Sequence, residues 1–354
     1  MNPDTSLPRT PSSLRAVLLL GLGLCACDVP REPVELVQGG LNRCGGAISV
    51  NPRGIFWNDF CAGESLRAPH SGGAPVTLAL SARPSAMRLD EESVYWISEP
   101  RPGERVQEVR RISQEGGTSS SLLSGQPSLS GLAVDASRVY WLGSEAGNER
   151  SNVLGATSKA GTGETQVLVS GLGNSFLLVK EAEALYWVQA EARPAGDTAL
   201  PTYSIMRLPL AGGTPVALAA GQPLPGDLAV HGSSVYWIYG GYRTGEQDRP
   251  PGALMRVPVE GGMPEKLTEI TNPLALVVDD RGISCVDGEV IIDSGFFGFG
   301  GTIRPASIIR LDHDGKNVET LVSKLETSPT SLTTYGGSVY WTSATGAVKR
   351  VDRD

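Results

Sequence analysis

The chain has 354 residues, of which 44 are Gly and 25 are Pro, and a formal net charge of -8. This acidic balance argues against a nucleic-acid binder, which needs a basic face. The length allows two ordinary domains, but Gly- and Pro-rich turns without a long amphipathic period indicate short strands in an all-β chain, a class that reaches this length as one domain.

The N-terminal segment has the features of a secretory signal peptide. Arg9 and Arg15 precede an apolar stretch, Ala16 to Leu24, that is too short to span a bilayer. The following Leu24-Cys25-Ala26-Cys27 resembles a bacterial lipobox. The resemblance implies cleavage before Cys27 and attachment of lipid to this residue. The alternative is an ordinary signal peptide with an incidental cysteine.

Two cysteines lie at the ends of the first predicted hairpin. Cys44 and Cys61 flank predicted strands at Ala47 to Asn51 and Ile55 to Phe60. In an oxidising compartment this arrangement favours a disulfide, and the alternative is two unpaired thiols.

One short pattern, an apolar residue followed by Tyr and Trp, recurs along the whole chain. Its copies are Gly54-Ile-Phe-Trp57, Ser93-Val-Tyr-Trp96, Arg138-Val-Tyr-Trp141, Ala184-Leu-Tyr-Trp187, Ser234-Val-Tyr-Trp237, Gly282-Ile-Ser-Cys285 and Ser338-Val-Tyr-Trp341. Neighbouring copies are 39 to 56 residues apart, and all six tryptophans of the chain occupy the last position. Such a period indicates stacked units that cannot bury their apolar faces alone. We therefore predict a β-propeller of seven blades.

The third copy illustrates the predicted blade. Strands a, b, c and d, counted from the centre outward, are expected at Gly131 to Asp135, Arg138 to Leu142, Val153 to Ser158 and Thr165 to Ser170. On strand b, Tyr and Trp point to opposite faces, so that each can pack against a neighbouring blade. A buried Trp removes roughly 150–250 Å² from water, so we interpret the tryptophans as core residues and Cys285 as a buried, inert thiol.

The last copy lacks an outer strand. It supplies strands a, b and c at Leu332 to Tyr335, Ser338 to Thr342 and Val348 to Val351, and then the chain ends. Upstream of the first blade, Pro33 to Gln38 resembles a strand d, and we predict that it pairs beside Ala347 to Asp352 and hides an exposed edge. The expected organisation is a signal peptide at 1–26, a linker at 27–32 and a seven-bladed propeller of four-stranded antiparallel blades at 33–354.

Two copies of the repeat resemble a known motif. Tyr340-Trp-Thr-Ser343 and Phe56-Trp-Asn-Asp59 are similar to the YWTD and NHL types of propeller repeat. YWTD domains have six blades, and their motif Asp is present here only as Asp59, so the resemblance implies the architecture alone. The chain also resembles the propeller lipoproteins of bacteria such as myxobacteria.

The predicted b–c connections are long on one face of the ring. They run from Pro100 to Gln107, Ser144 to Ser151, Ala190 to Pro201, Gly240 to Gly252 and Asp287 to Arg304. Because function concentrates on loops held by a rigid scaffold, we predict a binding face here, the alternative being loops that merely vary in length. The candidate binding residues are Tyr239, Tyr242, Arg243, Asp248, Phe296, Phe297 and Phe299.

The starts of the inner strands are expected to line a central channel. Asn174, Asp227 and Asn272 are the polar candidates there. Ca²⁺ takes six or more oxygen ligands, so these residues offer at most a weak site, and a solvated channel is the favoured alternative. No zinc or nucleophile motif is present, and His70, His231 and His313 fall in or beside turns on the face opposite the long loops.

These features predict a lipid-anchored binding or scaffold module of the bacterial cell envelope, periplasmic or outer-membrane facing. Its partner would be a protein, peptide or glycan, and no enzyme activity or cofactor is expected. The alternatives are a channel-centred hydrolase or lyase with a weak Ca²⁺ site and a structural envelope component.

Overall fold

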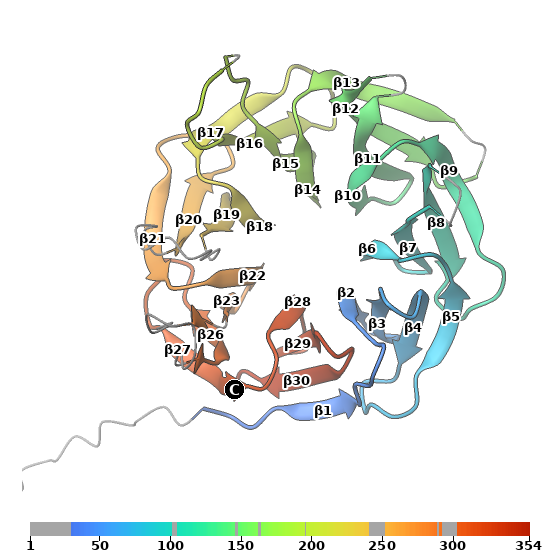
Figure 1. The fold of residues 1–354 in the computed structure, drawn as a ribbon, viewed down its shortest axis with the longest axis vertical. Helices are drawn as coiled ribbons and strands as arrows, with labels where there is room; N and C mark the ends of the chain where they lie inside the picture. The colour runs from blue at the N-terminus through green and yellow to red at the C-terminus, as the bar shows by residue number, and fades with distance from the viewer. Residues whose placement is uncertain are drawn as a thin grey trace, which may run out of the picture.

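The computed structural model describes residues 30–100, 105–145, 148–161, 164–194, 196–240, 252–288, 290–291 and 303–354. These residues form strands and turns without a helix, and seven four-stranded antiparallel sheets stand in a ring around a central axis (Figure 1). The predicted seven-bladed β-propeller is confirmed. The predicted signal peptide, with Cys27, lies outside the described residues.

The strands follow one another from the centre outward in every blade. Blade 1 consists of β2 (Gly45–Asn51), β3 (Gly54–Asp59), β4 (Glu64–Ala68) and β5 (Val76–Leu80). Blade 2 consists of β6 (Ser85–Leu89), β7 (Ser93–Ser98), β8 (Gln107–Ser113) and β9 (Ser120–Gln126). Blade 3 consists of β10 (Leu129–Val134), β11 (Arg138–Glu145), β12 (Asn148–Ser158) and β13 (Thr165–Leu172). Blade 4 consists of β14 (Ser175–Glu181), β15 (Ala184–Ala190), β16 (Tyr203–Pro209) and β17 (Val216–Gln222).

The second half of the ring follows the same order. Blade 5 consists of β18 (Pro225–His231), β19 (Ser234–Tyr239), β20 (Gly252–Pro258) and β21 (Glu265–Ile270). Blade 6 consists of β22 (Pro273–Asp279), β23 (Gly282–Asp287), β26 (Ala306–Leu311) and β27 (Glu319–Leu325). Blade 7 consists of β28 (Pro329–Tyr335), β29 (Ser338–Ser343), β30 (Val348–Asp352) and β1 (Val34–Val37).

The N-terminal strand completes the last blade, as predicted. β1 pairs antiparallel with β30, with Val34 opposite Arg350 and Val37 opposite Val348 (Figure 1, blue beside red). Leu36 and Val37 are buried in the same cluster as Trp57 of blade 1. β1 therefore closes the sheet of blade 7 and also buries apolar surface of blade 1.

The core consists of seven clusters, each between two neighbouring blades. In six of them the aromatic residue of one blade's strand b lies with the next blade's Trp or its replacement. The pairs are Phe56 with Trp96, Tyr95 with Trp141, Tyr140 with Trp187, Tyr186 with Trp237, Tyr236 with Cys285 and Tyr340 with Trp57. Between blades 6 and 7, Ser284 replaces the aromatic residue, and Trp341 packs with Ile308 and Leu321. The tryptophans are at most 2% exposed, so their predicted core role is confirmed.

The cysteines behave as the sequence indicated. Cys44 and Cys61 form a disulfide with a Cα–Cα distance of 5.2 Å, which links the segments flanking the β2–β3 hairpin. Cys285 is fully buried in the tryptophan position, and burial raises the pKa of its thiol well above the ordinary value. This thiol is therefore protonated at neutral pH and packs as an apolar group.

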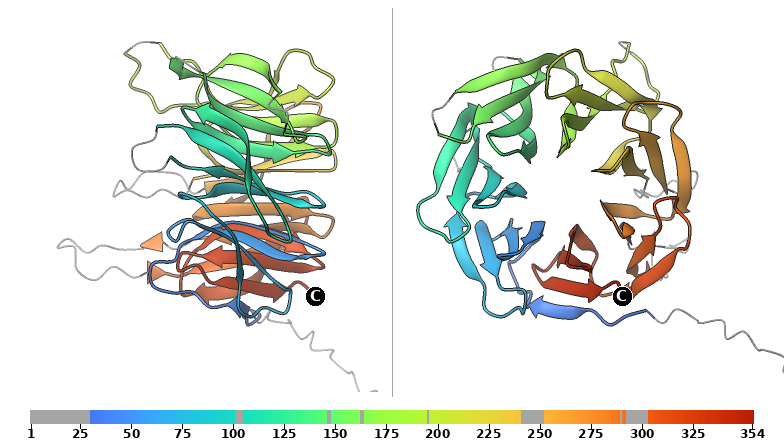
Figure 2. Two further views of the ribbon diagram at one scale, coloured as in Figure 1. Left: turned by 90° about the vertical axis from the view of Figure 1, so that its right-hand side faces the viewer. Right: turned by 180° about the vertical axis from the view of Figure 1, so that it is seen from behind.

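One predicted loop is a strand pair instead. The expected connection Ser144 to Ser151 is mostly an extension of β11 and β12, with Ser144 opposite Asn152 and Glu145 opposite Asn148. Backbone hydrogen bonds can extend a strand pair even where the side chains show no apolar alternation. The polar sequence of this segment therefore gave no sign of strands. A second short pair, β24 (Val290–Ile291) with β25 (Ile303–Arg304), lies within the predicted connection Asp287 to Arg304 (Figure 2, orange).

The closure by β1 can be tested on its buried side. Leu36→Ala removes a buried side chain between blades 7 and 1 and is expected to cost about 2–5 kcal/mol of unfolding free energy. The matched control Glu35→Ala changes an exposed side chain on the same strand and should cost less than about 1 kcal/mol. Urea unfolding measures both, and equal effects would contradict the closure.

Candidate functional site

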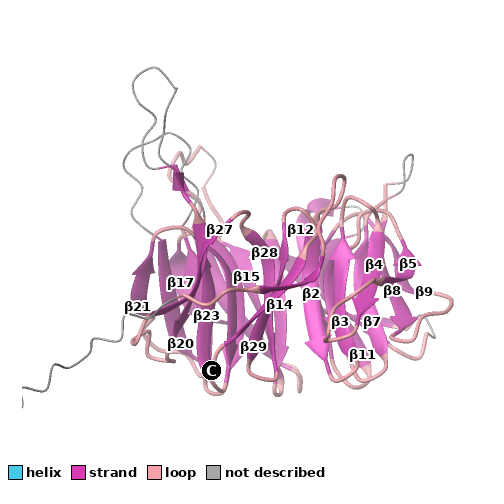
Figure 3. Cartoon of the chain, turned by 90° about the horizontal axis from the view of Figure 1, so that it is seen from below, coloured by secondary structure: helices cyan, strands magenta, loops and turns pink. Residues whose placement is uncertain are grey.

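The two ends of the ring differ in the length of their connections. On one end, which we name the tight-turn face, strands a and b and strands c and d are joined mostly by short turns. On the other, the long-loop face, β15 and β16 are joined through residues 191–202, β19 and β20 through 240–251, and β23 and β26 through 288–305. The C-terminus lies on the tight-turn face (Figure 3).

The predicted binding residues lie at the long-loop face or outside the described residues. Tyr239 is the last residue of β19, is half-buried and pairs with Ala253. The remaining candidates lie outside the described residues: Tyr242, Arg243, Asp248, Phe296, Phe297 and Phe299.

The described part of the connection between β15 and β16, residues 191–194 and 196–202, is held in place by Glu191 at its start. The carboxylate of Glu191 accepts hydrogen bonds from Ser204 Oγ at 2.7 Å, from Thr202 Oγ1 at 2.7 Å and from the Gly221 amide at 2.7 Å. These hydrogen bonds lower the pKa of Glu191, and the bond from the Gly221 amide has the largest effect. Near the end of this connection, Leu200 is 74% exposed. The sequence analysis named no residue here, although a Glu followed by two hydroxyl residues near the far end of a loop was a usable signal.

The three predicted channel residues do not occupy equivalent positions. Asp227 lies inside β18, next to Leu228, which pairs with Trp237. Asn174 and Asn272 instead precede β14 and β22, where their backbone carbonyls accept hydrogen bonds from Ala190 and Gly288. The two asparagines bond the third residue after Trp187 and Cys285, whereas Asp227 pairs with Ile238, the first residue after Trp237. Asp227 therefore lies at a different level of its inner strand from the two asparagines.

Asp227 joins two blades through its carboxylate. Oδ1 accepts a hydrogen bond from the Leu228 amide at 2.8 Å, and Oδ2 accepts one from the Leu276 amide of β22 at 2.8 Å. Burial raises the pKa of Asp227 to about 6, against these two bonds and the charge of Arg88, which lower it. The carboxylate thus links the inner strands of blades 5 and 6.

Arg88 is the charged residue that complements Asp227 across the ring. It lies on β6 of blade 2, and its Nη1 and Nη2 donate to the carbonyls of Met87 at 2.8 Å and Leu178 at 3.4 Å. Burial lowers the pKa of Arg88, and the charge of Asp227 opposes that change. The sequence analysis missed Arg88, because its partners in blades 4 and 5 are distant in sequence. No group of three or more potential metal ligands occurs among the described residues.

The titration of Asp227 predicts a pH effect. Its folded pKa of about 6 lies above the ordinary 3.8, so its contribution to stability is greatest below about pH 4 and falls as the pH rises to about 6. Asp227→Asn removes this titration. The unfolding midpoint of the variant should therefore rise relative to wild type between pH 4 and 6 and then stay level, which thermal melts at a series of pH values measure. Parallel profiles would contradict the assignment.

On the tight-turn face, matched side chains connect neighbouring blades. We name these latch pairs, each formed by the a–b turn of one blade and the c–d turn of the next. They are Asn51 with Gln114 (hydrogen bond, 3.0 Å), Asp90 with Lys159 (ion pair), His231 with His313 (stacked, 5.4 Å between centroids), Asp279 with Arg353 (ion pair) and Tyr335 with His70 (stacked, 5.1 Å). All three histidines lie on the tight-turn face, as expected, and all three serve in these pairs.

A second device on this face is a repeated arginine. On strand c of six blades, Arg pairs with the strand-b position of Tyr, as Arg67 does with Phe56 and Arg256 with Tyr236. Four of these arginines donate to a backbone carbonyl in the next blade's c–d turn or its equivalent, and we name these contacts arginine clasps. The clasps are Arg67 to Gln114 at 3.0 Å, Arg111 to Lys159 at 2.6 Å, Arg256 to His313 at 3.0 Å and Arg310 to Arg353 at 3.1 Å.

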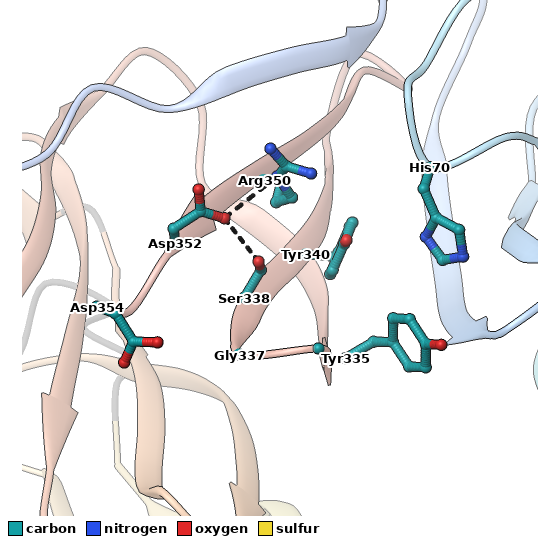
Figure 4. A pocket seen from close by; sticks show the side chains of 9 residues that line it. His70, Tyr335, Gly337, Ser338, Tyr340, Arg350, Asp352 and Asp354 are labelled. Carbon is teal, nitrogen blue, oxygen red and sulfur yellow. Dashed lines mark hydrogen bonds and ion pairs between the residues drawn. The ribbon is translucent and has the colours of Figure 1, made fainter.

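Between blades 7 and 1 the tight-turn face holds a pocket of about 480 Å³. His70 and Tyr335 stand on one side, and Arg350, Ser338 and Asp352 on the other (Figure 4). Asp352 accepts a hydrogen bond from Ser338 Oγ at 2.6 Å and lies 3.4 Å from Arg350 Nε.

Comparison with known proteins shows the fold. No protein-family model and no curated protein matches the sequence. Among solved structures, virginiamycin B lyase from Staphylococcus aureus superposes with a TM-score of 0.64 at 13% identity, over 91% of this chain and 99% of that chain. Oligogalacturonate lyase from Vibrio parahaemolyticus gives 0.61 at 12% identity, over 90% and 92%. The likeness is one of fold alone.

A nidogen/laminin complex also matches, at 17% identity over 74% of this chain and 90% of that chain. Its TM-score is 0.49, and we draw no conclusion from it. Within the described residues, no helix has the length and apolar character needed to cross a membrane.

Proposed function

We propose that the protein is a rigid binding module outside the cytoplasm, tethered by lipid at Cys27, which presents its long-loop face to a protein, peptide or glycan. The observation that carries the proposal is the asymmetry of the ring: long connections leave strands b on one face, while mostly short turns close the other. Propeller blades fixed by interblade cores form the kind of scaffold on which loops acquire binding roles.

The loop at residues 191–202 supports this assignment most directly. Glu191 at its start accepts a hydrogen bond from Thr202 at its end, and Arg193 donates to the carbonyl of Asp197 at 2.9 Å. A loop ordered before binding loses less conformational entropy when a partner arrives. Leu200 in the same connection exposes an apolar side chain that such a partner would bury.

The position of the N-terminal segment supports the proposed orientation. Arg31 donates from Nη1 to the Asp352 carbonyl at 2.9 Å and lies 3.1 Å from Glu319, so the chain joins the rim at the tight-turn end. Cys27 is four residues upstream of Arg31, a reach of at most about 14 Å in extended chain. A lipid at Cys27 would hold the tight-turn end near the membrane and direct the long-loop face away from it.

The disulfide supports an oxidising compartment. Cys44 and Cys61 are bridged, and such bonds persist mainly outside the cytoplasm. The alternative of a channel-centred hydrolase or lyase has less support, because both oxygens of the Asp227 carboxylate already accept backbone hydrogen bonds.

The long-loop face can be tested with two matched surface changes. Leu200→Glu alters an exposed apolar residue of the ordered loop, and Met263→Glu alters a still more exposed one in a turn of the tight-turn face. Leu200→Glu should reduce by at least about tenfold the recovery of cross-linked partners from an envelope fraction, because a charge would be buried at the contact. Met263→Glu should leave recovery unchanged; the reverse pattern would refute the proposed face.

The proposed lipid anchor predicts that loss of Cys27 moves the protein from the membrane to the soluble fraction. Cys27→Ser removes the acceptor sulfur, so the processed protein should move from the membrane pellet to the soluble fraction after lysis. A wash at high salt is the control, since it releases proteins held by charge alone. Persistence of the variant in the pellet after removal of its signal peptide would contradict a lipid anchor.

A further inference from the structure

At the interface between blades 7 and 1, an arginine occupies the clasp position but forms no clasp. Arg350 occupies the register of the clasp arginines, opposite Tyr340. Its polar contact within the described residues is from Nε to Asp352 at 3.4 Å, and no bond from it reaches the c–d turn of blade 1. That turn is held by β1, because the Gly73 amide donates to the Leu36 carbonyl at 3.0 Å. Ring closure by the N-terminal strand therefore leaves both Nη atoms of Arg350 without a hydrogen-bond partner among the described residues.

Two of the four formed clasps bind a carbonyl and a carboxylate together. Arg67 contacts the Gln114 carbonyl at 3.0 Å and the next residue's carboxylate, Glu115, at 2.7 Å. Arg256 contacts the His313 carbonyl at 3.0 Å and the following Asp314 carboxylate at 2.9 Å. In both cases a glycine comes next in the sequence. The shared ligand is a peptide turn in which a carbonyl precedes an acidic residue and a glycine.

The pocket beside Arg350 has suitable size and walls for such a turn. Its volume of about 480 Å³ lies within the range of small-ligand pockets. The stacked rings of His70 and Tyr335 form an aromatic wall facing Arg350 (Figure 4), and the buried Nε2 of His70 has no hydrogen-bond partner among the described residues.

The two carboxylates at the pocket do not exclude an acidic ligand. Asp352 is bound by Ser338 Oγ at 2.6 Å, and Asp354 pairs with Arg281 at 2.6 Å. The pair with Arg281 lowers the pKa of Asp354. These acids and the two arginines balance in charge, so the site suits one carboxylate together with a carbonyl, and not a highly charged polyphosphate.

We propose that the pocket between blades 7 and 1 binds an acidic turn of a partner polypeptide, with the carbonyl and the carboxylate on the Arg350 guanidinium and the turn packed against His70 and Tyr335. The ligand reproduces at this interface what the chain itself supplies to Arg67 and Arg256. The site lies on the tight-turn face and stands independently of the function proposed for the long-loop face.

The test uses a fluorescent cyclic peptide carrying Ser-Gln-Glu-Gly-Gly, the sequence of residues 113–117, and the folded chain without its signal peptide. Fluorescence anisotropy should show saturable binding. Replacing the peptide's Glu by Gln should weaken binding at least about tenfold, because a charge-assisted bond to the guanidinium is lost. This comparison requires no variant of the protein. Equal binding of both peptides, or of neither, would overturn the proposal.

Two arginine variants separate binding from stability. Arg350→Gln should weaken peptide binding at least about tenfold while changing the melting temperature little, because its clasp is not formed. Arg256→Gln removes a formed clasp and should lower the melting temperature while binding persists. Unchanged affinity in Arg350→Gln, or loss of binding in Arg256→Gln with the fold retained, would place the site elsewhere.

Discussion

The structure depends on the burial of one aromatic residue from each of two neighbouring blades in a shared interface. A blade has two apolar faces and cannot shield either by itself, so each Trp is covered by the blade before it, as Trp141 is in the cluster of Tyr95. This arrangement is stable only when the ring is closed, because an open array leaves two faces exposed. The same contact therefore determines the fold and requires a closure.

Closure has consequences beyond stability. β1 serves as the outer strand of blade 7, so the chain enters the ring at the tight-turn end beside Asp352. The same strand holds the c–d turn of blade 1 through the Leu36 carbonyl. A single topological requirement thus places the tether, orients the long-loop face and leaves Arg350 beside a pocket.

The two faces of the ring serve different purposes. On the tight-turn face, latch pairs and arginine clasps connect blade to blade, and chemically different pairs, such as Asp279 with Arg353 and His231 with His313, occupy equivalent positions. On the long-loop face the connections vary in length. There, Glu191 holds its loop through hydrogen bonds from Ser204 and Gly221 of the same blade, not through a neighbouring blade. The contacts that stabilise the ring thereby lie on one face, and the loops whose length varies lie on the other.

The sequence by itself determined the number of blades, the closing strand, the buried tryptophans and the pairing of Cys44 with Cys61. These features follow from local patterns, namely strand alternation and spacing within a repeat, which the linear order preserves. Only the tertiary structure decided that Asp227 lies at a different level from Asn174 and Asn272, because strand pairing fixes the alignment of the inner strands. It alone also brought Arg88 to Leu178 and His70 to Tyr335, since a closed ring joins residues that no local pattern relates.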